Sequence, residues 1–277
     1  SNNTAIGRAA LGATTTGTQN TAVGSLAGQT LTDADYNIAI GYEAGNDLTT
    51  GVQNTLIGGN AGDSLTTGVS NVAIGYQALS TEDAHGYNTA IGNRALKTQD
   101  AGDHAYNVAV GNDAGLLVTT GVQNILIGAH AGDALTTGSG NVALGYNALS
   151  LEDAHGRNVA VGRDALTNLN AGADAYNVAV GYNAGLSINT GKYNVLVGGL
   201  AGDSITEGEY NVALGYNALA GENAHGRNIA IGTNALAVQD AGADAYNVAV
   251  GHNAGLGVTT GIQNTLIGGL AGDALTT

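Results

Sequence analysis

Short apolar segments recur along the whole chain at a nearly fixed spacing, and each begins with asparagine and ends with glycine. One of them reads NVAVG at 177–181, and variants such as NIAIG at 37–41 and NTLIG at 54–58 occupy equivalent places. Runs rich in β-branched residues and bounded by Asn and Gly are typical of short β-strands. The pattern therefore predicts a chain built from many short strands.

The asparagines that open these segments number sixteen, from Asn3 to Asn264. They are 17 residues apart, except that the spacing is 19 after Asn88, Asn158 and Asn228, so three short units and one long unit make a 70-residue block. Helical-hairpin repeats have periods of about 33 residues or more, which excludes them here. We expect an all-β fold, a parallel β-solenoid (β-roll) of about sixteen 17-residue coils, with a second short strand near 134–138 and its equivalents.

The array is expected to run over 1–277 as a single domain, and to be a fragment of a longer fibre because its pattern is unfinished at Thr277. The two extra residues of each long coil are expected to bulge outward, since solenoids place insertions in loops.

The asparagine column is predicted to be a structural ladder, because identical Asn side chains that stack at a turn can hydrogen-bond to one another. Its predicted members are Asn37, Asn54, Asn71, Asn88, Asn107, Asn124, Asn141, Asn158, Asn177, Asn194, Asn211, Asn228, Asn247 and Asn264.

Side chains alternate between the two faces of a strand, so Val178 and Val180 point one way and Ala179 points the other. If the valines fill the coil, the Ala or Leu column faces outward, and an apolar stripe on the outside of a protein marks an interface. We expect a homo-oligomer, most simply a parallel homotrimer, with a dimer or a lateral sheet as alternatives. The predicted interface residues are Ala39, Leu56, Ala73, Ala109, Leu126, Ala143, Ala179, Leu196, Ala213, Ala249 and Leu266.

The composition supports a thin, regular core. The chain has 46 Gly, no Pro, Cys, Met, Trp or Phe, and 12 Tyr as its only aromatic residues. The net charge of −15 with only seven Lys and Arg argues against nucleic acid as a partner. No window has the 18 or so continuous apolar residues of a membrane-spanning helix, so membrane insertion is not expected.

The segments NTAIG, NVAVG and NVALG, each followed by Ala three residues after the Gly, resemble the head repeats of trimeric autotransporter adhesins. They are also similar to the Asn-Thr-Ala-hydrophobic-Gly repeats of phage tail-fibre proteins. The adhesin heads are trimeric left-handed parallel β-rolls with a repeat near fourteen residues, whereas this chain has units of 17 and blocks of 70. The resemblance implies an extracellular, cell-surface or virion fibre that projects or attaches.

Histidines that recur in EDAHG or ENAHG segments are candidate metal ligands: His85, His155 and His225. Imidazole beside carboxylate can bind a divalent ion, although block duplication alone also explains the recurrence. Calcium is a second candidate, through Asp100 or the AGD aspartates such as Asp63, but the spacing does not match an EF-hand loop. We expect a solvated acidic face and no cofactor.

The sequence contains no nucleophile elbow and no phosphate loop, so no catalytic residues are assigned and the chain is not expected to be an enzyme. Tyrosines lie just before the Asn or just after the Gly, where they either cover the turn or stack on sugars. The expected function is the structural shaft of a phage tail fibre or adhesin. The alternatives are a module that binds glycans or another surface through a repeated face, and a subunit of a self-assembling extracellular filament.

Overall fold

The computed structural model describes residues 2–277, and these form an all-β parallel β-solenoid in which every strand has three residues. The chain forms two compact units, the first ending at Gly140 and the second spanning Asn141–Thr277. No helix occurs among the described residues, so none of them belongs to a helix that is long and apolar enough to cross a membrane. The solenoid class predicted from the repeats is therefore confirmed.

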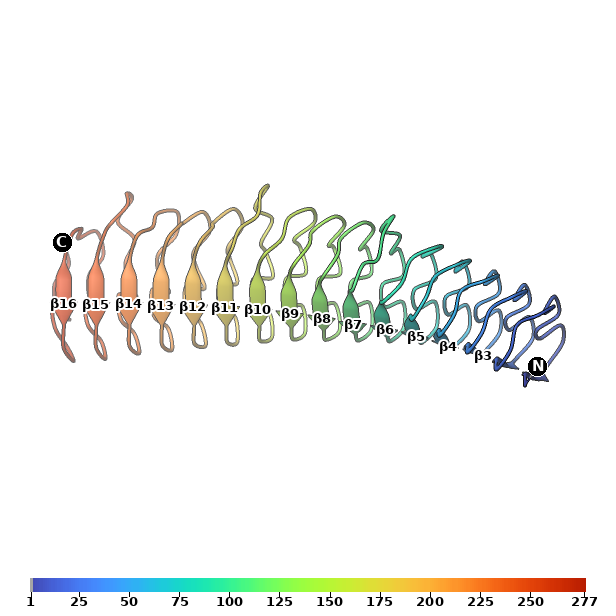
Figure 1. Ribbon diagram of the computed structural model, residues 1–277. Helices are drawn as coiled ribbons and strands as arrows, with labels where there is room; N and C mark the ends of the chain where they lie inside the picture. The colour runs from blue at the N-terminus through green and yellow to red at the C-terminus, as the bar shows by residue number, and fades with distance from the viewer. Residues whose placement is uncertain (1) are drawn as a thin grey trace. The chain divides into compact units, whose positions relative to one another are not determined.

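The first unit contains eight strands that pair in parallel with their neighbours in chain order and in unbroken register (Figure 1). Equivalent residues of successive coils lie side by side, as with Ala22 and Ala39. The strands are β1 (Thr4–Ile6), β2 (Thr21–Val23), β3 (Ile38–Ile40), β4 (Thr55–Ile57), β5 (Val72–Ile74), β6 (Thr89–Ile91), β7 (Val108–Val110) and β8 (Ile125–Ile127).

The second unit repeats this arrangement with eight further strands (Figure 1). They are β9 (Val142–Leu144), β10 (Val159–Val161), β11 (Val178–Val180), β12 (Val195–Val197), β13 (Val212–Leu214), β14 (Ile229–Ile231), β15 (Val248–Val250) and β16 (Thr265–Ile267).

The glycine four residues after each asparagine ends the strand and turns the chain. Gly181 has a φ of 144°, a region that L side chains rarely adopt. A Cβ at this position would overlap the carbonyl oxygen of Gly198 in the next coil. Both the torsion and the stacking of the coils therefore require glycine at this corner.

The second predicted strand, near 134–138 and its equivalents, is wrong in the described coils, where these residues form bends. The hydrogen bonds explain the difference. The backbone N–H groups of Thr49, Thr50 and Gly51 all donate to the carbonyl of Thr66 in the next coil. Three successive N–H donors that share one carbonyl acceptor indicate a curved turn. In a pair of extended strands the N–H groups would instead donate to different carbonyls along the partner strand.

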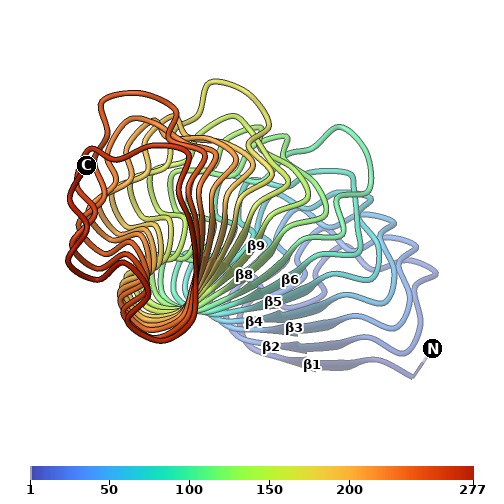
Figure 2. The same cartoon turned by 90° about the vertical axis from the view of Figure 1, so that its left-hand side faces the viewer.

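Each long coil bulges outward, as predicted. Gly102, Gly172 and Gly242 lie in these loops, and a Cβ on any of them would have no neighbour within 4 Å. The loops project beyond the neighbouring coils (Figure 2).

The predicted orientation of the strands is wrong: the middle residue faces the interior, and its two neighbours face outward. Ala179 is 0% exposed, whereas Val178 and Val180 are half-buried on the outer face. The residues predicted as an interface all lie in the coil interior in the same way: Ala39, Leu56, Ala73, Ala109, Leu126, Ala143, Ala179, Leu196, Ala213 and Ala249 are at most 1% exposed, and Leu266 is the half-buried member in the last coil. They are core residues and cannot meet a partner chain.

The narrowness of the coil explains this reversal. A Cβ built on Gly45 would lie 3.9 Å from the Cβ of Ala39 across the interior, so the space between the walls holds little more than methyl groups. Leucine fits at the middle strand position only because the facing residues are glycines. Leu56 packs against Gly45 and Gly62, and a Cβ on either would lie within 2.8 Å of a Leu56 methyl.

Candidate functional site

The asparagines form a continuous hydrogen-bonded ladder inside each unit. The backbone N–H of Asn194 donates to Oδ1 of Asn177 at 2.9 Å, and Nδ2 of Asn177 donates to the carbonyl of Gly191 at 2.8 Å. All the predicted ladder residues except the half-buried Asn264 are at most 1% exposed. Each Asn therefore joins two coils, and in the short coils up to that of Asn247 the Asn side chain also closes its own coil, which is a structural task. In the long coils Nδ2 of Asn158 and Asn228 donates instead to Gly156 and Glu222.

The candidate site is built on another interior column, eleven residues after each asparagine. Most coils place a buried aliphatic residue there, such as Leu65, Leu135 and Ile205. In one coil of each block the same position is glutamate, and Glu82, Glu152 and Glu222 are all 0% exposed. Three carboxyl groups thus occupy an interior column that holds Leu, Ile or Val in most other coils and buried Gln99 and Gln239 in two of them.

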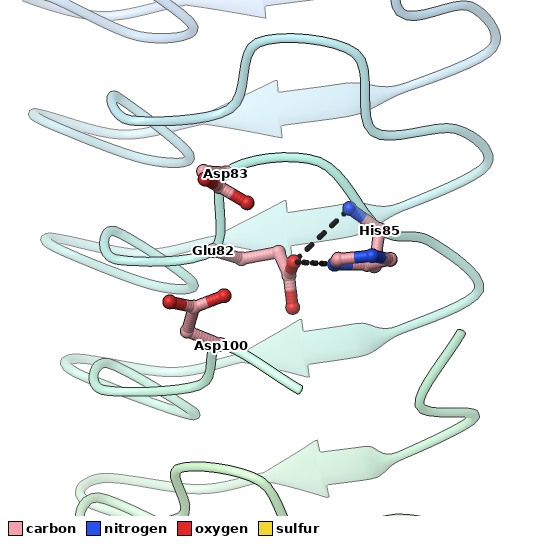
Figure 3. Close-up of side chains that lie close together, drawn as sticks. All are labelled: Glu82, Asp83, His85 and Asp100. Atoms are coloured by element: carbon pink, nitrogen blue, oxygen red, sulfur yellow. Dashed lines mark hydrogen bonds and ion pairs between the residues drawn. The ribbon is translucent and has the colours of Figure 1, made fainter. Parts of the chain in front are cut away.

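The histidine of each segment lies beside the buried glutamate of its own coil, as Figure 3 shows for His85 and Glu82. Oε1 of Glu82 accepts a hydrogen bond from the backbone N–H of His85 at 3.1 Å and lies 3.3 Å from its ring Nδ1. Nδ1 of His155 lies 3.6 Å from Oε1 of Glu152. The short separation of three residues within a tight turn brings each pair together.

Further carboxylates complete three clusters in the described part of the chain: Glu82, Asp83, His85 and Asp100; Glu152, Asp153 and His155; and Glu222, His225 and Asp240. In each cluster, one ligand atom from every residue lies within 4.8 Å of the others. Asp100 belongs to the next coil, as Figure 3 shows, and Asp240 follows the same rule in its block. The structure thus joins the histidine segments to Asp100, which the sequence suggested only as a separate calcium candidate.

Burial raises the pKa of all three glutamates above their ordinary value. For Glu222, loss of hydration raises the pKa to about 7. Hydrogen bonds from the nearby backbone oppose this increase without cancelling it. An isolated carboxylate in an interior column is unfavourable, so each site favours a bound proton or a bound cation.

Several polar atoms of the clusters are buried without a hydrogen-bond partner among the described residues. They are Oε2 of Glu82 and Nδ1 of His85, His155 and His225. The Nδ1 of His85 is close to Glu82 but does not meet hydrogen-bond geometry. Buried polar groups in native proteins are nearly always satisfied, so these atoms mark the place where a ligand would be expected.

The AGD aspartates of the calcium candidate do not gather in this way. Asp63 is half-buried and accepts a hydrogen bond from Nδ2 of Asn60 at 3.3 Å, and loss of hydration raises its pKa. Asp133 pairs with His130 at 3.2 Å. Among the described residues, neither belongs to a group of three or more potential ligands.

The tyrosines lie on the outer surface, and all twelve are between 42% and 57% exposed. Those before the asparagine form stacks: the rings of Tyr176 and Tyr193 are 5.7 Å apart, and those of Tyr193 and Tyr210 are 4.9 Å apart. Arg157 lies over Tyr176 and Arg227 lies over Tyr210. The outer tyrosine column is therefore an ordered ladder of flat groups.

Sequence reasoning missed the burial of the glutamates, although the sequence contains the signal. Reading one position along all sixteen units shows Glu in three coils where ten others have Leu, Ile or Val and the remaining three have Thr14, Gln99 and Gln239. No protein-family model matches the chain, and no curated protein matches it either.

Proposed function

We propose that the chain is the structural shaft of an extracellular fibre, of the phage tail-fibre or cell-surface adhesin kind, and that it self-associates through the outer face of its strands. It acts mechanically and catalyses no reaction. Strands that stack in register, tied by the buried asparagine ladder, give each unit a repetitive backbone suited to bearing load. At about 4.8 Å per coil, eight coils extend about 38 Å.

The observation that carries the proposal is the chemistry of the outer strand face. Its exposed members include Ile38, Ile40, Ile125, Val195 and Val197. From the residue before each asparagine to the residue after each glycine, no unit contains Asp or Glu, although the chain has 22 of them. Two copies of a chain with a net charge of −15 repel each other, so a face without carboxylates is the one that a second copy can approach.

The test is sedimentation equilibrium of the wild type and of two matched variants in EDTA. Val178→Asp with Val195→Asp places carboxylates on the outer strand face and is expected to give a monomer with an unchanged circular dichroism spectrum. Asn189→Asp with Ser204→Asp adds the same charge at exposed loop positions and should leave the oligomer intact. A mass of three chains supports a trimer, and a folded wild-type monomer at micromolar concentration would contradict the proposal.

A glycan-binding role is the second candidate, and the tyrosine ladder favours it. Flat aromatic groups beside arginine suit the stacking and hydrogen bonding that sugars require. On a glycan array, Tyr193→Ala should reduce binding at least tenfold, whereas Tyr182→Ala, which lies in the other tyrosine column, should have a smaller effect. Absence of binding by the wild type would reject this role and leave the shaft proposal untouched.

A further inference from the structure

We propose that each 70-residue block contains a binding site for a divalent transition-metal ion of the zinc class. The ligands are the buried glutamate, the histidine three residues later, and at least one aspartate. The aspartate lies either directly after the glutamate or at the equivalent position of the next coil, which stacks on it. In the first block these are Glu82, His85, Asp83 and Asp100, and the cluster is shown in Figure 3. The inference is independent of the proposed shaft function, because it concerns side chains within single chains.

The geometry leaves little to rearrange. The four ligand atoms of the first cluster already lie within 4.8 Å of one another. Ligands about 2.0–2.1 Å from a tetrahedral zinc ion are about 3.3 Å apart, so the widest pair must close by about 1.5 Å. Oε1 of Glu82 and Nδ1 of His85 are already at 3.3 Å. Rotation of the aspartate side chains can supply the remaining movement.

Unpartnered buried atoms point to a ligand independently of the acidic cluster itself. The Glu82 side chain is 0% exposed, yet its Oε2 has no hydrogen-bond partner among the described residues. Nδ1 of His85, in the same cluster, is likewise buried and unpartnered. One ion between these atoms would satisfy a buried carboxylate oxygen and a ring nitrogen together.

The blocks differ in a way that fits a shared ion. The position after each buried glutamate is Asp83, Asp153 or Asn223. The position stacked on it in the next coil is Asp100, Asn170 or Asp240. Whenever one of the two aspartates is replaced by asparagine, the other is retained, so every block keeps Glu, His and at least one Asp. A merely solvated acidic surface has no need of this compensation.

The ligand set selects the class of ion. Imidazole suits Zn²⁺, Co²⁺ and Ni²⁺, whereas Ca²⁺ and Mg²⁺ prefer sites made only of oxygen. With two aspartates the first block offers three carboxylates and one imidazole. Each of the other two clusters has one residue fewer. We therefore expect the first block to bind most tightly.

The experiment is equilibrium dialysis of the full chain against Zn²⁺ after removal of metal with EDTA, with bound metal counted by mass spectrometry. The expected result is three ions per chain. Glu82→Gln should remove one of them, and Gln at all three glutamate positions should weaken binding about 100-fold or more. Co²⁺ should give the visible absorption of a tetrahedral complex in the wild type but not in the triple Gln variant.

Two controls separate loss of ligands from loss of fold. His85→Ala, His155→Ala and His225→Ala together remove one ligand per site and should abolish the cobalt spectrum. His130→Ala with Asp133→Asn disrupts a histidine–carboxylate pair outside the clusters, at 3.2 Å, and should keep all three ions. Fewer than one ion per chain, an unchanged number in the triple Gln variant, or binding of Ca²⁺ without Zn²⁺ would overturn the proposal.

Discussion

Replacing the three buried glutamates with leucine should make the stability of the chain less dependent on pH. Glu82, Glu152 and Glu222 occupy an interior column that holds Leu65 and Leu135 in other coils, so leucine fits the local packing. The substitution removes three titrating groups and extends the aliphatic column. In the presence of EDTA the experiment measures the glutamates without any bound metal.

The sign and size of the effect follow from the pKa of Glu222, which burial raises from 4.5 to about 7. The folded chain holds a proton that the unfolded chain releases between these values, so the stability of the wild type falls as the pH rises from about 4.5 to about 7. At about 1.4 kcal/mol per unit, the full shift corresponds to about 3 kcal/mol. Water at the rim of the site screens part of this, which leaves about 1–2 kcal/mol at Glu222.

Solenoids need not unfold in a single step, so the assay should report on local stability. Hydrogen exchange read by mass spectrometry on peptides around 211–240, at pH values from 5 to 8.5 and corrected for intrinsic rates, meets this need. Protection in the wild type should fall with pH, whereas the Leu variant should stay nearly constant. The isosteric Glu→Gln variant also lacks the titrating carboxyl and should behave like Leu in its slope. A pH dependence that persists in the Leu variant would refute the reasoning.

Three further substitutions test the fold, each by the same local exchange measurement and by urea denaturation. Asn177→Ala removes the acceptor for the buried N–H of Asn194 and should cost about 2–4 kcal/mol; a change below 0.5 kcal/mol, roughly the scatter of surface substitutions, would contradict the ladder. Gly181→Ala places a Cβ on the carbonyl of Gly198 and should cost about 3 kcal/mol or more, with exchange spreading to both coils. Leu196→Ala leaves a cavity in the interior and should lower the free energy of unfolding by about 2–5 kcal/mol. If this residue were exposed to solvent, the free energy of unfolding would hardly change.

The sequence was sufficient to predict the parallel solenoid, because periodic spacing, short β-rich segments and fixed glycines all point to stacked coils. It was not sufficient to orient the strand. Alternation defines two faces but does not say which one is inside, and the prediction takes the valines as the residues that fill the coil. The better signal is the set of residues found at each strand position across the units. The position of Ala179 holds only Ala or Leu, whereas the position of Val178 holds Val, Ile or the partly polar Thr. In a narrow coil, small size rather than hydrophobicity marks the interior.

The metal ligands could not be assembled from sequence for a related reason. Asp100 is 18 residues from Glu82, and only the stacking of a long coil on a short one places them together. Recurrence of the histidines is weak support, because the interior columns force the block to repeat as a whole. Leu56 opposes glycines in its own and the preceding coil, so one coil cannot be exchanged without its neighbours. The differences between blocks support the site more strongly, since packing of the interior does not require an aspartate to be kept at one of two stacked surface positions. A cation bound between the two positions needs an aspartate at one of them at least, and every block keeps one.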